Sequence, residues 1–207
     1  AGSPGVINCY LCRMKKFVIS LLSVIFLCAA ATAQVLVGMT DTTAYFPQLE
    51  GRRVAVLANH TAVARFGDGA PGGTADAGEH VASSVDAATG IPIRSLYDGN
   101  TKRPSDEAMR SFDVLVVDMQ DVGLRFYTYY ITMLRMMDAC AESGRSVIVL
   151  DRPNPNGHHV DGPVLDMKYK SGVGALPIPV LHGLTMGEIA RMAVGEGWAA
   201  SCDLQVV

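Results

Sequence analysis

Polar side chains suited to binding a sugar gather in one short stretch, residues 118–129 (DMQDVGLRFYTY). Fixed donors and acceptors can hold the hydroxyl and amide groups of a sugar, and aromatic rings can lie against its apolar face. We therefore predict that this stretch binds substrate, with Asp121 as a catalytic residue and with substrate-binding side chains from Asp118, Gln120, Arg125, Tyr127 and Tyr129. A structural alternative fits equally well. In it, Asp121 and Arg125 form an ion pair that holds the loop, and the tyrosines pack in the core.

A second polar stretch, DRPNPNG at residues 151–157, offers substrate-binding candidates in Asp151, Arg152 and Asn154. Its two prolines restrict the backbone, and a restricted backbone can hold polar side chains ready for a ligand. A plain proline-rich turn without a binding role is the competing interpretation.

A third stretch, LHGLTMGE at residues 181–188, opens a predicted helix and contains a further catalytic candidate, His182. The histidine could face a ligand at the positive end of that helix, although a lone histidine is more often structural. Glu188 lies three residues after Thr185, which is the spacing of a capping box at a helix start. Glu188 is therefore kept as a substrate-binding candidate and ranked below Asp121.

Other catalytic motifs lack the context that their chemistry needs. Gly67, Gly69 and Gly72 match a dinucleotide fingerprint as letters, but they do not directly follow a strand or open a convincing helix. His158 and His159 have no partners at metal-ligand spacing, and no nucleophile elbow of the type Gly-x-Ser-x-Gly occurs. We therefore expect no nucleotide, no metal and no other cofactor.

The elements that must position these residues alternate between strands and helices. Short apolar runs predict strands at residues 54–59, 91–97, 112–118 and 146–151, and three- and four-residue apolar spacing predicts a helix at residues 125–142 that stops at Gly144. A second helix is predicted at 185–196, and a further strand begins near 204. This order indicates an α/β fold with a Rossmann-like, doubly wound and mostly parallel sheet. In such a sheet, ligands bind beyond the carboxyl ends of the strands, where the polar stretches lie.

Composition and the N-terminal sequence predict an exported protein. The net charge of −3 argues against a nucleic-acid partner, and 49% hydrophobic residues suit a globular core. Lys15, Lys16, an apolar run and Ala31-Thr32-Ala33 fit a signal peptide at residues 14–33, after an upstream extension at 1–13. We expect a mature chain from Gln34 that is periplasmic or extracellular and has no stable membrane anchor.

Two cysteines, Cys140 and Cys202, remain after the predicted cleavage. An exported protein can oxidise such a pair to a disulfide, but sequence alone does not place the two sulfurs close together. Their pairing is left open here.

Five stretches in register make the chain resemble the bacterial exo-β-N-acetylmuramidases, a family once known only as a domain of unknown function. They are TADAGEHV, TGIPIRSLY, DMQDVGLRFYTYYITM, VLDRPNPNGHHVDGPVLD and PIPVLHGLTMGEIA, between residues 74 and 190. The resemblance implies a Rossmann-like domain, at residues 34–207 here, and a smaller second domain, with the active site between them. It also implies removal of terminal N-acetylmuramic acid from peptidoglycan fragments (muropeptides), without a cofactor.

The chain departs from the family pattern at two places. Family members carry a Pro-Glu-His-Gly-Phe motif before the stretch that matches residues 74–79, whereas residues 65–73 (RFGDGAPGG) stand here without an acidic-His pair. The glutamate of that motif is the family's main catalytic candidate, and Glu79 corresponds to a different position. The chain also stops before the smaller domain, so we expect an incomplete domain without detectable muramidase activity. A catalytically inactive remnant that binds muropeptides or other carbohydrate is the alternative.

Overall fold

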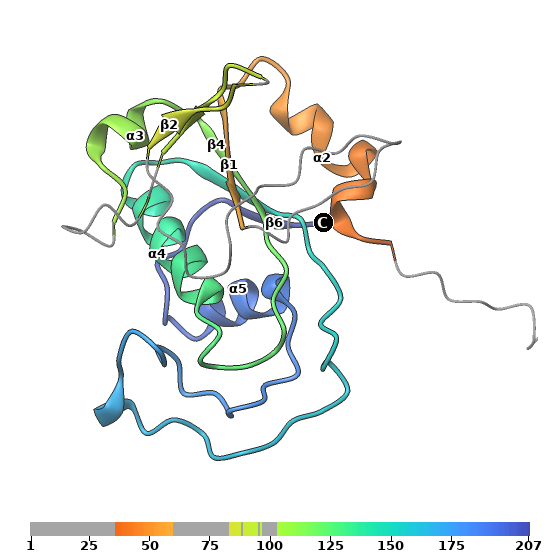
Figure 1. Ribbon diagram of the computed structural model, residues 1–207, viewed down its shortest axis with the longest axis vertical. Coiled ribbons are helices and arrows are strands. Elements are labelled where there is room, and N and C mark those ends of the chain that lie inside the picture. Colours follow the sequence, from red (N-terminus) through yellow and green to blue (C-terminus); the bar gives the residue numbers. More distant parts are fainter. Residues whose placement is uncertain (1–35, 60–82, 88, 95, 97–102) are drawn as a thin grey trace, which may run out of the picture. The chain divides into compact units, whose positions relative to one another are not determined.

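The computed structural model describes residues 36–59, 83–87, 89–94, 96 and 103–207. The predicted signal peptide and upstream extension, the glycines at 67–72 and Glu79 lie outside the described residues. Figure 1 shows the described elements along the chain. They are η1 (Gly38–Thr40), α2 (Thr42–Leu49), β1 (Val54–Ala58), β2 (Ser84–Val85), β3 (Pro92–Ile93), α3 (Asp106–Arg110), β4 (Val114–Asp118), α4 (Tyr129–Glu142), β5 (Ser146–Val149), η2 (Met167–Tyr169), α5 (Met186–Gly195) and β6 (Leu204–Val206).

Four of the strands form one parallel sheet in the order β1-β4-β5-β6. Val54 pairs with Val114, Val114 with Ser146, and Val147 with Leu204. All five residues of β4 are buried, because this central strand has a strand on each side and side chains over both faces. The predicted mostly parallel α/β fold is therefore confirmed, and so are the strands that begin near residues 54, 114, 146 and 204.

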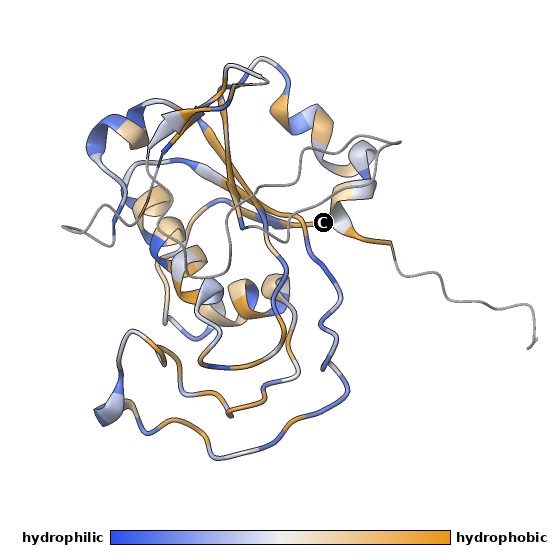
Figure 2. Cartoon of the chain, in the orientation of Figure 1, coloured by the Kyte–Doolittle hydropathy of each residue, from blue (hydrophilic) through white to orange (hydrophobic). Residues whose placement is uncertain are grey.

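Alternating side chains of the sheet enter two separate hydrophobic cores. Leu115, Val117, Val147 and Val149 point to the face covered by α4 and α5. Val114, Val116, Ile148 and Leu150 point to the opposite face, where Tyr45 of α2 packs on them. Figure 2 shows the strands as hydrophobic along most of their length, whereas the segment that leaves β5 begins with hydrophilic residues. That change marks the edge of the sheet where the predicted site lies.

Helix α4 begins four residues later than predicted, at Tyr129 and not at residue 125. The backbone before it is used in other contacts: N–H of Arg125 donates to the carbonyl of Val180 (2.8 Å) and N–H of Tyr127 to that of Leu124 (2.8 Å). Phe126, which falls within the predicted helix, is 57% exposed as a result. The predicted stop at Gly144 is confirmed by its left-handed backbone (φ 64°).

The strand predicted at residues 91–97 is present only as the short β3 in the part that the structure describes, and it does not join the main sheet. Only Pro92 and Ile93 are extended, and they pair antiparallel with Ser84 and Val85, outside the main sheet. The turn between them is closed by the N–H of Gly90, which donates to the carbonyl of Asp86 (2.8 Å). Proline has no N–H for a ladder, which confines such a strand to an edge.

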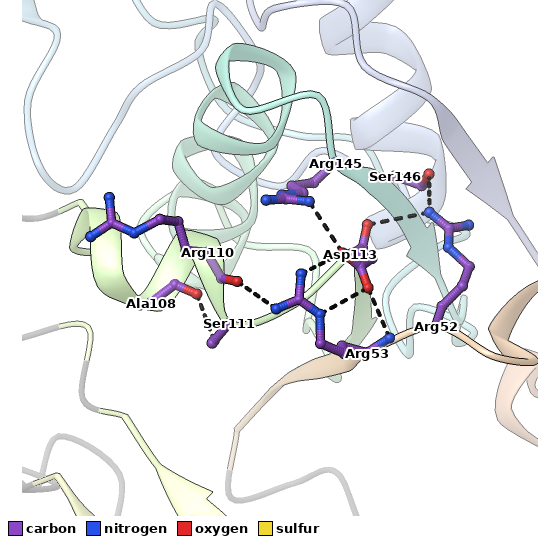
Figure 3. A network of polar contacts seen from close by, with 8 residues as sticks. All are labelled: Arg52, Arg53, Ala108, Arg110, Ser111, Asp113, Arg145 and Ser146. Carbon is purple, nitrogen blue, oxygen red and sulfur yellow. Dashed lines mark hydrogen bonds and ion pairs between the residues drawn. The ribbon is translucent and has the colours of Figure 1, made fainter.

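The amino ends of β1, β4 and β5 are joined by an arginine-rich network around Asp113 (Figure 3). The Asp113 carboxylate accepts from Arg53 (2.7 Å) and from Arg145 (3.2 Å), and Arg52 donates to the Asp113 carbonyl and to Ser146. Hydrogen bonds from the Arg53 side chain and backbone hold the pKa of Asp113 well below its usual range. This network lies at the edge of the sheet opposite the carboxyl ends of the strands.

Across the described part of the chain, no helix has the length and apolar character needed to cross a membrane.

Candidate active site

The loop after β4 and the segment before α5 are held side by side by their backbones. N–H of His182 donates to the carbonyl of Gly123 (3.0 Å), and Leu124 and Leu181 form an isolated antiparallel bridge. Gly123 has a left-handed backbone (φ 79°), and a Cβ there would lie 2.5 Å from the side-chain nitrogen of Asn154. This glycine therefore lets three loops meet beyond the carboxyl ends of β4 and β5.

Asp121 is a buried carboxylate in this junction, with only 2% of its surface exposed. Its Oδ1 accepts from the N–H of Gly123 (2.7 Å), and its Oδ2 has no hydrogen-bond partner among the described residues. Burial raises the pKa of Asp121 to about 6, against the opposing effect of the Gly123 and Val122 N–H groups. A carboxyl group with this pKa can exchange a proton near neutral pH.

His182 is the second fully buried polar side chain of the junction. Its Nδ1 accepts from the N–H of Leu184 (3.2 Å), so the proton of the neutral ring lies on Nε2. The ring of Tyr130 meets it edge to face, with centroids 6.5 Å apart. Burial lowers the pKa of His182, which keeps the ring neutral at pH 7.

The structure brings the two predicted catalytic residues together, with Nε2 of His182 3.9 Å from Oδ1 of Asp121. This distance exceeds that of a hydrogen bond, and the lowered pKa of His182 argues against a charged imidazolium there. We therefore describe the two residues as a neutral imidazole facing a carboxyl group, and not as an ion pair. Neither Oδ2 of Asp121 nor Nε2 of His182 has a hydrogen-bond partner within the described part of the chain.

Asp118 and Arg152 form a buried ion pair at the ends of β4 and β5. The carboxylate Oδ1 accepts from Nη2 (2.7 Å) and Nε (2.8 Å) of Arg152, and the two side chains are 8% and 10% exposed. Both charges are thereby compensated within the protein. Their first role is to join two strand ends, and a substrate contact stays a prediction.

Asp151 and Glu188 are both occupied at the start of α5. Asp151 accepts from the Thr185 hydroxyl (2.6 Å) and from the N–H of Gly187 (2.9 Å). Glu188 accepts from the N–H of Thr185 (2.8 Å) and Thr185 Oγ1 from the N–H of Glu188 (3.2 Å), so the predicted capping box is confirmed. These contacts fix the segment that carries His182.

Arg125 does not form the ion pair with Asp121 that the structural alternative required. Its guanidinium donates to the carbonyls of Pro163 (2.8 Å) and Ile178 (2.7 Å), because the long connection between β5 and α5 passes over it. Gln120 donates to the carbonyls of Asp121 and Pro153, and Asn154 to that of Leu184. These three side chains remain partly exposed and tie the loops to one another.

Tyr127 and Tyr129 stack edge to face, with ring centroids 4.9 Å apart, and both are partly exposed. They are therefore neither fully in the core nor fully in solvent, and their faces remain candidates for a sugar ring. Tyr130 is the tyrosine that enters the core, where its hydroxyl accepts from the N–H of Ala175 (3.2 Å).

Gly123 and Tyr130 are the residues that sequence reasoning missed. A glycine two residues after a strand-end aspartate is the available signal for Gly123, since its N–H can reach back to that carboxylate. No group of three or more His, Cys, Asp or Glu side chains able to hold a metal ion is found in the described ranges.

Comparison with known proteins assigns the chain to a family. The profile described as "Exo-beta-N-acetylmuramidase NamZ, N-terminal" matches residues 54–207, which is most of the chain. The chain belongs to this family. It is 41% identical over 185 residues to the protein named "Peptidoglycan beta-N-acetylmuramidase NamZ" of Bacillus subtilis (strain 168), and the match covers 79% of this chain and 44% of that relative.

Two crystal structures of DUF1343 family proteins from Bacteroides fragilis NCTC 9343 share the fold. The first has a TM-score of 0.71 at 47% identity and matches 84% of this chain and 52% of its own. The second has a TM-score of 0.69 at 36% identity and matches 82% of this chain and 48% of its own. The chain thus spans about half the length of the relative and of the two crystal structures that it matches.

Proposed function

We propose that this domain serves peptidoglycan turnover as part of an exo-acting β-N-acetylmuramidase, a glycoside hydrolase that removes terminal N-acetylmuramic acid from cell-wall fragments. Membership of the NamZ family supports the reaction class, and the name of the Bacillus subtilis relative supports the substrate class. The proposed partners are muropeptides, and the proposal requires no nucleotide or metal.

The buried pair of Asp121 and His182 is the observation that carries this proposal. Glycoside hydrolysis needs a group that gives a proton to the leaving oxygen and a group that acts at the anomeric carbon. A carboxyl group whose pKa is raised to about 6 can hold that proton near neutral pH. Because both side chains are buried, we propose that they hold and pass the proton from beneath the sugar.

Partly exposed polar side chains near the ends of β4 and β5 are proposed to contact the sugar itself. Gln120 and Tyr127 lie on the loop after β4, Asn154 lies on the loop after β5, and Tyr129 is the first residue of α4. Together they offer two amides and a pair of aromatic rings. Aromatic faces and fixed amides are the contacts expected for a ring with hydroxyl and N-acetyl groups.

A binding function without turnover is the second candidate. It is favoured by residues 65–73, which stand where the family resemblance expects a glutamate-bearing motif. Without that glutamate, the domain retains the loops that would recognise the sugar and lacks the carboxylate that the family resemblance implies for the chemistry.

One experiment with two readouts tests both candidates. The 207-residue chain is incubated with disaccharides that end in N-acetylmuramic acid or in N-acetylglucosamine at the non-reducing end, and binding and sugar release are measured. We expect binding of the first disaccharide, little binding of the second, and no detectable release.

Insertion of the glutamate-bearing segment of a NamZ relative at residues 65–73 then separates the two candidates. Gain of release supports the hydrolase, and binding without gain supports the remnant. Glu107→Gln on α3, an exposed side chain away from the site, is the control variant. Absence of binding in every form contradicts both candidates.

We also propose that the protein is exported to the periplasm or the extracellular space. The support is the signal-peptide pattern at residues 14–33 and a proposed substrate that lies outside the cytoplasm. N-terminal sequencing of the mature protein should begin at Gln34. A product that retains Met14 to Ala33 contradicts this proposal.

A further inference from the structure

Two cysteines lie in the described part of the chain, and neither belongs to the proposed site. Cys140 is in the last turn of α4 and is fully buried, and Cys202 lies two residues before β6 and is partly buried. Both pack in the same hydrophobic core, on the face of the sheet that α4 and α5 cover.

A hydrogen bond to the Asp138 side chain brings the chain around Cys202 onto the chain around Cys140. N–H of Ala200 donates to the carboxylate of Asp138 (2.7 Å), which fixes the chain two residues before Cys202 to the helix two residues before Cys140. After the turn at Gly144, N–H of Arg145 donates back to the carbonyl of Cys140 (2.8 Å).

The same arrangement continues on the other side of the two cysteines. N–H of Val147, in β5, donates to the carbonyl of Asp203 (2.8 Å), the residue after Cys202. The residues on either side of Cys202 are therefore hydrogen-bonded to Asp138 of α4 and to Val147 of β5. Cys140 lies between Asp138 and Val147 in the sequence. The charge of Cys202 is also among the causes that raise the pKa of the Cys140 thiol, after burial, which fits two neighbouring sulfurs.

We propose that Cys140 and Cys202 form a disulfide that joins the end of α4 to the segment entering β6. Cys202 is the more accessible thiol, so its thiolate attacks a small external disulfide such as oxidised glutathione and releases one thiol. The Cys140 thiolate then attacks the sulfur of Cys202 and expels the second thiol. Two protein thiols are oxidised, one external disulfide is reduced to two thiols, and two protons leave the protein.

The cross-link would act on the edge of the sheet. β6 is the last strand of the four-stranded sheet and pairs only with β5 among the described strands. A disulfide that closes the long loop between residues 140 and 202 restricts the unfolded chain, so we expect the melting temperature to rise by about 5 °C or more on oxidation.

Peptide mapping of the full chain tests the proposal directly. The protein is equilibrated in a glutathione redox buffer, its free thiols are alkylated, and it is digested with trypsin without reduction. Cleavage after Arg135, Arg145 and Arg191 places the two cysteines in the peptides MMDACAESGR and MAVGEGWAASCDLQVV. We expect these two peptides as one linked species that separates on reduction.

Two variants complete the test. Cys202→Ser should abolish both the linked species and the redox dependence of the melting temperature, whereas Cys28→Ser, outside the described residues, should change neither. The proposal is overturned if Cys140 and Cys202 stay alkylated across the redox range, or if either one links instead to Cys9, Cys12 or Cys28.

Discussion

Nε2 of His182 lies 3.9 Å from Oδ1 of Asp121, and the two side chains occupy a junction where both are almost fully buried. The carboxylate comes from the loop after β4 and the imidazole from the segment that opens α5, and the N–H of His182 donates to the carbonyl of Gly123 between them. A buried carboxyl group with an unpartnered oxygen costs stability. The position of the Asp121 carboxyl group beside His182 therefore fits a functional pair better than a structural one.

Asp121→Asn should raise the stability of the domain at neutral pH. The pKa of Asp121 is raised from 3.8 to about 6 in the folded state, so folding takes up a proton between these values. The contribution of Asp121 to the free energy of unfolding should therefore fall as pH rises from about 4 to about 6, and then stay level. The asparagine does not titrate and can still accept from Gly123. We expect it to add up to about 3 kcal/mol at pH 7 and nothing below pH 4.

Urea unfolding of the wild type and the variant at several pH values measures this difference. Asp161→Asn, which changes an exposed carboxylate, is the control and should shift stability little at any pH. If Asp121→Asn destabilises the domain at pH 7, the carboxylate has a structural partner that the present geometry does not explain.

Asp118→Ala should destabilise the domain far more than an average surface substitution. It leaves the buried guanidinium of Arg152 without its partner, at a cost of about 3–5 kcal/mol. Asp118→Asn keeps an acceptor for Nε of Arg152 and should cost less. Replacing both residues, as in Asp118→Leu with Arg152→Met, should cost less than the sum of the single losses. Denaturant midpoints of the wild type, of Asp118→Leu, of Arg152→Met and of the double variant give the coupling energy, and additive losses contradict the pairing.

Gly187→Ala and Gly195→Ala in α5 should have opposite effects. A Cβ on Gly187 would lie 2.4 Å from Val206 and 2.8 Å from the Asp151 carboxyl carbon, so the start of the helix would be pushed off the sheet. A Cβ on Gly195 meets nothing within 4 Å, and alanine there should stabilise the helix by up to about 1 kcal/mol. Thermal melts of the two variants should shift in opposite directions, and stabilisation by Gly187→Ala would show that the start of α5 tolerates the added methyl group.

The sheet and its strand-end polar loops were predictable because their signals are local. Continuous apolar runs marked β4 and β5, and the Thr185–Glu188 spacing marked the start of α5. The partners of the site residues were not predictable, because they depend on contacts between distant segments. Arg125 is bound by carbonyls of Pro163 and Ile178, residues that no local pattern connects to it. The late start of α4 has the same cause, since its first predicted turn is used to bind residue 180.

Val56→Lys should reduce self-association of the domain without unfolding it. Val54 and Val56 lie on β1, at one end of the sheet formed by the described strands, and are 41% and 63% exposed. Val54 pairs with Val114 and Val56 with Val116, whose side chains belong to the core on the α2 side of the sheet. The apolar face of the sheet on this side therefore continues onto β1, where it is exposed. Exposed apolar residues on an edge strand favour pairing with a second chain, and a lysine there opposes it.

Light scattering at increasing protein concentration measures this association, and a thermal melt checks that the fold is kept. Val160→Lys is the matched control, because it adds the same charge at a valine that is 69% exposed and lies outside the sheet. We expect it to leave association nearly unchanged. Equal reductions in the two variants indicate a general effect of net charge, and then β1 is not the contact surface.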